Sequence, residues 1–75
     1  MQIPMSFLEK GALAIVKSLS LSKDLSQKLF DLGIVPEAKF KVVQKSNSLV
    51  IKLNEIKLAL DRNFCDNIIV EIVAS

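Results

Sequence analysis

The order of apolar and polar residues divides the chain into strand-like segments and one segment with a helical period. Residues 12–19 are rich in apolar and β-branched types, which predicts a first strand. Residues 22–33 change to a helical period, because Leu25, Leu29 and Leu32 recur at spacings of four and three. An isolated helix of this length is marginal in water, so we expect the leucine stripe to dock on the sheet.

Both ends of the predicted helix carry local signals. Ser22 is a good N-cap, and Asp24 lies in the first turn, where the helix dipole favours a negative charge. Gly33 follows the last periodic residue, at the position where a helix stop turns left-handed. Ile34 supplies the apolar contact that often accompanies such a stop.

Alternating apolar segments follow a proline turn at residues 35–38. The predicted strands after the helix cover residues 39–45, 49–53, 56–60 and 68–73. Asn54 and Glu55 form a two-residue hairpin turn, and residues 46–48 form a polar tip. Residues 61–67 read as a short helical turn before the last strand.

Five short strands, with one short helix after the first, predict a mainly β fold. The expected architecture is a small, closed, strongly bent antiparallel barrel, since closure removes exposed strand edges. SH3-like and OB-like barrels both fit, and periodicity alone does not separate them. We expect residues 1–75 to form a single domain, with residues 1–6 as a flexible arm.

Composition narrows the class of protein. Hydrophobic residues make up 51% of the chain, which suffices for a small core and argues against intrinsic disorder. The net charge of +2 is too small to indicate a polyanion ligand. A single cysteine excludes an internal disulfide framework and fits a reducing compartment. Every apolar run is too short for a membrane span, so we expect a cytoplasmic protein.

Few residues offer catalysis or metal binding. The chain has no histidine, and its two glycines cannot build a phosphate loop or a nucleophile elbow, so we expect no enzyme. Cys65 is expected to pack in the core, because no histidine or second cysteine completes a zinc site. The eight acidic residues are dispersed along the sequence. Weak contact with a divalent metal, Fe or Zn, and weak self-association therefore stay open without an identifiable site.

The aromatic content argues against two further classes of binding protein. Four phenylalanines are the only aromatics, whereas a nucleic-acid-binding barrel or a proline-binding SH3 groove needs aromatic platforms. Phe30 lies off the leucine stripe, on the side of Lys23 and Gln27. Phe30 either packs under the N-terminal arm against Met5 or Phe7, or it belongs to an exposed surface that contacts a partner.

The segment LFDLGIVP, from Leu29 to Pro36, resembles the hallmark of the FeoA family, the ferrous iron transport protein A domains. The block consists of Leu29, Leu32, Gly33, Ile34 and Pro36. Further matches lie at Leu8, Gly11, residues 40–43, residues 56–60, Cys65 and residues 68–70. The resemblance thus extends over about residues 6–73.

This resemblance implies an SH3-like barrel and a role in ferrous iron uptake. Free-standing family members act beside the FeoB-type membrane GTPase transporter, so the expected partner is that transporter. We expect Lys23, Gln27 and Phe30 to form the partner surface. Similar domains form the C-terminal part of iron-dependent repressors, and a module of metal-dependent transcriptional regulation is the alternative. That alternative expects a winged DNA-binding domain, which residues 1–75 do not contain.

The sequence departs from the family pattern at the turns. Glu37 replaces the glycine that usually follows the proline, which predicts a type I turn in place of a type II turn. Asn54 replaces a common glycine and tolerates a left-handed conformation. The tip at residues 46–48 is shorter than the usual loop, and Gln27 and Lys28 stand where arginines are frequent.

Overall fold

The computed structural model describes residues 1–74 and contains one antiparallel sheet with the strand order β1-β6-β2-β3-β4-β5. The strands are β1 (Gln2–Pro4), β2 (Leu13–Leu19), β3 (Lys39–Lys45), β4 (Ser48–Leu53), β5 (Ile56–Asp61) and β6 (Ile68–Ala74). The helices are the 3₁₀ turn η1 (Met5–Phe7), α1 (Lys23–Asp31) and α2 (Arg62–Cys65). The predicted mainly β class, with a short helix before β3, is confirmed.

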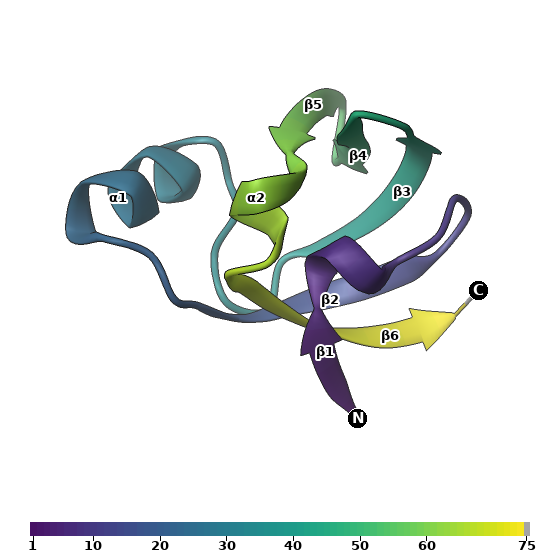
Figure 1. Ribbon diagram of the computed structural model, residues 1–75, viewed down its shortest axis with the longest axis horizontal. Helices are drawn as coiled ribbons and strands as arrows, with labels where there is room; N and C mark the ends of the chain where they lie inside the picture. Colours follow the sequence, from purple (N-terminus) through teal and green to yellow (C-terminus); the bar gives the residue numbers. More distant parts are fainter. Residues whose placement is uncertain (75) are drawn as a thin grey trace.

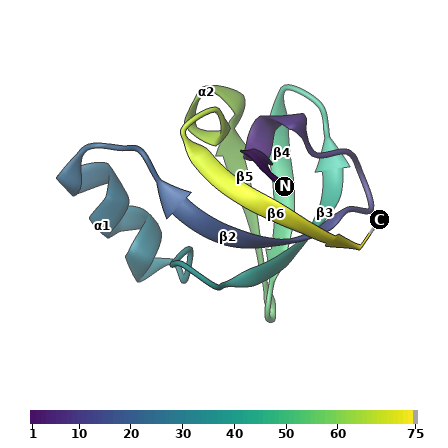
Figure 2. The ribbon, with the colours of Figure 1, turned by 90° about the horizontal axis from the view of Figure 1, so that it is seen from below.

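The sheet curls strongly but stays open, which corrects the expectation of a closed five-stranded barrel (Figures 1 and 2). Within residues 1–74, β1 pairs only with β6 and β5 only with β4. Register shifts between Val16 and Ser18 and between Val42 and Gln44 bend β2 and β3. Between the two edges lie η1 and α2, which contact each other. The arrangement is consistent with an SH3-like fold.

The N-terminal segment is ordered, which corrects the expectation of a flexible arm over residues 1–6. Gln2 and Pro4 lie opposite Glu71 and Ile69 of β6. The Met5 side chain is fully buried. Burial of a side chain of this size stabilises a small domain by about 2 kcal/mol, so the segment is part of the fold.

Helix α1 begins and ends as its sequence predicts. The Ser22 side chain accepts a hydrogen bond from the Leu25 backbone N–H at 3.3 Å. At the other end, Gly33 adopts φ +98°, and the Ile34 N–H donates to the Leu29 carbonyl at 2.9 Å. The Gly33 N–H donates to the Phe30 carbonyl at 2.9 Å, which completes a Schellman stop.

The turn after α1 differs from its prediction. Glu37 has φ +74°, and the Ala38 N–H donates to the Val35 carbonyl at 3.0 Å. Positive φ at the third residue of a turn that contains Pro36 is a type II geometry, so the predicted type I turn is wrong. The Glu37 N–H donates to the Val16 carbonyl at 2.7 Å, and this bond to β2 holds the turn in place.

One apolar core lies inside the curl of the sheet. Its buried side chains are Met5, Leu8, Ala12, Ala14, Val16, Leu29, Ile34, Phe40, Val42, Leu49, Ile51, Leu53, Leu60, Cys65, Ile68 and Val70. Cys65 is fully buried among them, which confirms its predicted core position. Helix α1 contributes Leu29 alone to the core, and the rest of the helix stands away from the sheet (Figure 2).

Candidate functional site

An apolar groove separates α1 from α2 and the end of β5. Two adjoining cavities of about 300 and 350 Å³ form it, and Leu25, Asp61 and Phe64 line both. The first cavity is also lined by Leu21, Asn63 and Asn67. The second is also lined by Lys28, Leu29, Leu32, Ala59 and Leu60. Volumes of this size are at the lower end of those of ligand clefts, about 300–1,000 Å³.

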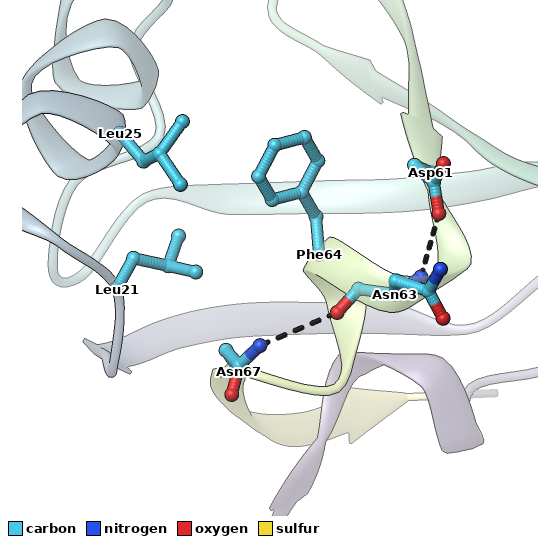
Figure 3. Close-up of a pocket in the computed structure, with 6 residues that line it drawn as sticks. All are labelled: Leu21, Leu25, Asp61, Asn63, Phe64 and Asn67. Carbon is cyan, nitrogen blue, oxygen red and sulfur yellow. Dashed lines mark hydrogen bonds between the residues drawn. The ribbon is translucent and has the colours of Figure 1, made fainter.

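Phe64 projects into the groove from α2, toward Leu21 and Leu25 (Figure 3). The short helix is held by its own caps, because the Asn63 backbone N–H donates to Asp61 Oδ1 at 2.8 Å. Asn67 closes the other end, where its Nδ2 donates to the Asn63 carbonyl at 3.3 Å. These bonds orient Phe64 and leave its side chain half-buried.

The leucine stripe of α1 does not dock as a whole on the sheet, which corrects the prediction for Leu25 and Leu32. Leu29 is 6% exposed and belongs to the core, whereas Leu25 is half-buried and Leu32 is 45% exposed. The stripe therefore supplies one core residue and one wall of the groove. The apolar period identified the correct face of α1, but the depth of burial depends on contacts with α2 that periodicity does not contain.

The predicted partner surface of Lys23, Gln27 and Phe30 lies on the opposite side of α1 from the groove, since each helical residue advances by about 100°. All three side chains are exposed, and Phe30 is 41% exposed. Gln27 Nε2 donates to Asp31 Oδ1 at 3.0 Å, one helical turn later. Helix α1 lies well apart from η1 in both ribbon views (Figures 1 and 2).

The residues of the family block, Leu29, Leu32, Gly33, Ile34 and Pro36, contribute more to the fold than to the groove. Leu29 and Ile34 are buried, and Gly33 makes the left-handed helix stop. Pro36 lies in the turn that leads to β3. Of the block, Leu32 is exposed and lines the groove together with Leu29.

Phe64 and Ala59 were missed as candidate residues by sequence reasoning. The only local signal for Phe64 is its place beside the buried Cys65 in a short helix, because neighbouring helical residues point about 100° apart. Nothing in the sequence shows that α1 stands opposite these residues. The groove arises from packing between two walls that lie at least 27 positions apart in the sequence, the separation of Leu32 and Ala59.

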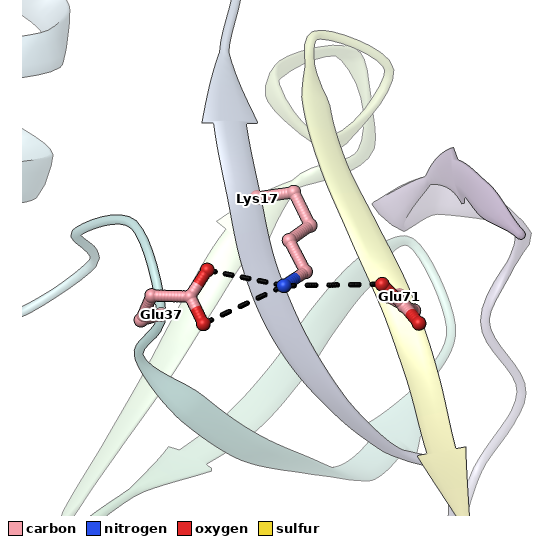
Figure 4. Close-up of polar contacts among 3 residues, drawn as sticks. All are labelled: Lys17, Glu37 and Glu71. Atoms are coloured by element: carbon pink, nitrogen blue, oxygen red, sulfur yellow. Dashed lines mark hydrogen bonds and ion pairs between the residues drawn. The ribbon is translucent and has the colours of Figure 1, made fainter.

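A charged cluster joins β2 to β6 and to the turn before β3. Lys17 Nζ of β2 lies 3.1 Å from Glu37 Oε2 and 3.8 Å from Glu71 Oε1 of β6 (Figure 4). The Glu37 side chain is well exposed, which limits the strength of its pair with Lys17. The cluster links the strained turn to two strands and is a structural feature.

The thiol of Cys65 is poorly suited to metal binding. Burial, followed by the nearby carboxylates of Asp66 and Asp61, raises the pKa of the Cys65 thiol from 9.0 to about 11. A metal ligand would be the thiolate, which this environment disfavours. Within the part of the chain that the structure describes, no three side chains of histidine, cysteine, aspartate or glutamate are grouped so as to hold a metal ion. No helix in that part is both long and apolar enough to cross a membrane.

Comparisons with known proteins identify relatives of this chain. A family model, the FeoA domain, matches residues 3–72. The solution structure of an FeoA protein from Chlorobium tepidum is 31% identical, with a TM-score of 0.89, and the match covers 96% of this chain and 71% of that chain. A comparison with curated protein sequences gave no match.

Two more distant structures share the fold. A crystal structure of an FeoA described as an iron uptake regulatory protein is 22% identical, with a TM-score of 0.89 and coverage of 97% of this chain and 99% of that chain. IdeR from T. acidophilum is 12% identical, with a TM-score of 0.87 and coverage of 95% of this chain and 34% of that chain. At these identities the likeness concerns the fold alone.

Proposed function

Because the chain belongs to the FeoA family, we propose that it is an accessory protein of ferrous iron uptake that binds the FeoB-type membrane transporter. The groove between α1 and α2 is the main contact surface. It acts by binding a protein and not by catalysis, on the cytoplasmic side of the membrane. Ferrous iron is the cargo of the transporter in this proposal, and no residue of the chain is assigned to hold it.

The open apolar groove is the observation that carries this proposal. Its walls combine a half-buried aromatic residue, Phe64, with the exposed Leu32 and the half-buried Leu25. Charged side chains, Lys28 and Asp61, complete the lining. An apolar centre with a charged rim is typical of a protein interface, and aromatic side chains in pockets often carry much of its binding energy.

The outer face of α1 is only a minor contact surface in this proposal. Lys23, Gln27 and Phe30 are exposed there, and a 41% exposed phenylalanine supplies apolar area beside polar groups. A partner that embraced α1 would touch both faces, whereas a partner that entered the groove would touch only the inner one. The two faces can be tested separately because no residue belongs to both.

Affinity of the purified chain for the cytosolic part of the transporter tests this function. Leu32→Lys places a charge in the groove at a position that is 45% exposed, so we expect an intact fold and binding weakened by at least about tenfold. Phe30→Ala is the matched control on the outer face, and its expected effect is below about threefold. Equal affinity of the parent and Leu32→Lys would contradict the assignment of the groove.

A second candidate function is a module of metal-dependent transcriptional regulation. The same fold occurs in IdeR and in a manganese-dependent transcriptional repressor, with TM-scores of 0.87 and 0.86. Deletion of the gene separates the two functions. The transporter function predicts slower ferrous iron uptake at unchanged transporter levels, whereas the regulatory function predicts changed transcript levels of metal-responsive genes.

A further inference from the structure

Strand β5 is an edge strand whose free side meets the groove. It pairs with β4 alone within residues 1–74, and it is the last strand in the order of the sheet. Ala59, Leu60 and Asp61 of β5 line the same cavity as Leu25 of α1 and the C-cap residue Leu32. In Figure 1, β5 lies on the α1 side of β4. An unpaired strand edge therefore faces a helix across an apolar gap.

The backbone groups at this edge can be assigned from the register. The two-residue turn at Asn54 and Glu55 makes Leu53 and Ile56 a hydrogen-bonded pair. Hydrogen-bonded and non-bonded pairs alternate along an antiparallel ladder, so Lys57 and Ala59 direct their N–H and C=O groups away from β4. Neither residue makes a turn or loop hydrogen bond within the described chain.

Side chains at this edge leave room for an added strand. Lys57, Ala59 and Asp61 share one face of β5, because side chains alternate along a strand, and all three are exposed. The small Ala59 stands in the middle, where the cavity of about 350 Å³ adjoins it. A side chain placed opposite Ala59 would share the face of the sheet on which Ala59 lies, beside this cavity.

We propose that the groove binds an extended peptide segment of the partner protein, which adds to the sheet as an antiparallel strand beside β5. This inference rests on the proposed function for the identity of the partner. Two hydrogen bonds join the peptide to the Ala59 backbone, and further bonds reach Lys57. An apolar side chain opposite Ala59 packs over this small residue beside the cavity. An acidic residue lies opposite Lys57 and a basic residue opposite Asp61, because opposite charges stabilise cross-strand pairs.

A second copy of the chain is the competing occupant of this edge. An antiparallel pair of β5 strands centred on Ala59 would place Lys57 of each copy opposite Asp61 of the other. The peptide is favoured because Leu25 and Leu32 line the cavity beside β5. A second copy would have to bring its own sheet and α1 into the same space. Sedimentation of the free chain distinguishes these occupants: we expect a monomer, and a dimer that Ala59→Pro dissociates would overturn the proposal.

A designed peptide tests the strand addition directly. The probe is a nine-residue synthetic peptide whose central five residues are lysine, threonine, leucine, threonine and glutamate. We expect it to shift the amide NMR signals of Lys57 and Ala59. Methylation of the leucine backbone nitrogen keeps the side chain but removes its hydrogen bond, so binding should weaken about tenfold. Exchange of the lysine and glutamate should also weaken it.

Ala59→Pro is the matched change in the protein. It removes an N–H that faces away from β4, and proline is tolerated on the free side of an edge strand. We expect an unchanged unfolding midpoint and about tenfold weaker peptide binding. The methylated peptide with the parent chain gives an independent answer if the variant unfolds. No peptide binding at millimolar concentration, or binding unaffected by methylation, would overturn the inference.

The transporter's cytosolic part separates this inference from the proposed function. If that part binds the parent and Ala59→Pro equally, while Leu32→Lys loses affinity, the groove function stands and strand addition is wrong. If the peptide binds as described but the cytosolic part does not bind, the surface is correct and the transporter is not its partner.

Discussion

The sheet core and helix α1 use similar apolar residues but pack to very different depths. Val16, Val42 and Ile51 on the strands are fully buried, whereas Leu32, the C-cap of α1, is 45% exposed. Strands β2, β3 and β4 each have a neighbouring strand on both sides, while α1 supplies a single buried side chain, Leu29. The difference shows that an amphipathic helix can be held by its ends and one anchor while most of its apolar face remains available to a partner.

Truncation in these two regions should have the most different effects on stability. Ile51→Ala leaves a cavity in the core, and we expect a loss of about 3–4 kcal/mol in the free energy of unfolding. Leu32→Ala removes a half-exposed side chain, and the expected loss is below about 1 kcal/mol. Urea unfolding of both variants measures the contrast. Similar losses would mean that Leu32 is packed as deeply as the core.

The two glycines, one of which lies where α1 joins the core, differ in the space around them. Gly33 and Gly11 both have positive φ, at +98° and +94°. A Cβ on Gly33 would lie 2.9 Å from Leu53 Cδ2, whereas a Cβ on Gly11 would meet nothing within 4 Å. Gly33→Ala should therefore cost about 2 kcal/mol and Gly11→Ala about 1 kcal/mol. Equal costs would show that Leu53 yields without penalty.

The buried thiol makes the stability of the core depend on pH. Burial raises the pKa of the Cys65 thiol from 9.0 to about 11, so the unfolded chain ionises first as pH rises. The folded state then binds more protons between pH 9 and pH 11, and its stability falls over that range. Relative to Cys65→Ala, the parent should lose about 1 kcal/mol by pH 10. A constant difference across this range would contradict the buried protonated thiol.

Substitutions in the turn that leads from α1 to β3 should change the stability of the protein least. Glu37 occupies φ +74°, which favours glycine, while its carboxylate pairs with Lys17 at 3.1 Å. Glu37→Gly relieves the strain and Glu37→Ala keeps it, and both remove the ion pair. We expect the glycine variant to be more stable than the alanine variant by about 1 kcal/mol in thermal unfolding. The reverse order would mean that the turn relaxes.

Elements with local signals were predictable from the sequence. Ser22 and Gly33 fix the ends of α1 through hydrogen bonds within one turn of the helix. Asn54 has φ +57° in the hairpin turn, as its ability to adopt left-handed conformations predicts. In these cases the determining partner lies within a few residues, so the sequence alone contains the cause.

Elements fixed by distant partners were not predictable. Strand β1 has three residues and exists because Gln2–Pro4 pair with β6 at the far end of the chain. Glu37 takes positive φ although a type I turn would suit it locally, because its N–H bonds to Val16 of β2. The groove likewise depends on where α2 places Phe64 relative to α1. The sequence predicted the apolar face of α1 correctly, but only the structure shows that this face forms one wall of a groove.

Chemical-shift mapping with the transporter's cytosolic part tests whether the groove between α1 and α2 is the contact surface. The labelled parent chain is titrated with the unlabelled cytosolic part, and the amide and methyl signals of the two sides of α1 are compared. We expect the largest shifts at Leu25, Leu32 and Phe64, with small shifts at Lys23 and Gln27. Shifts confined to the outer face of α1, or to the strands of the core, would contradict the assignment of the groove as the functional site.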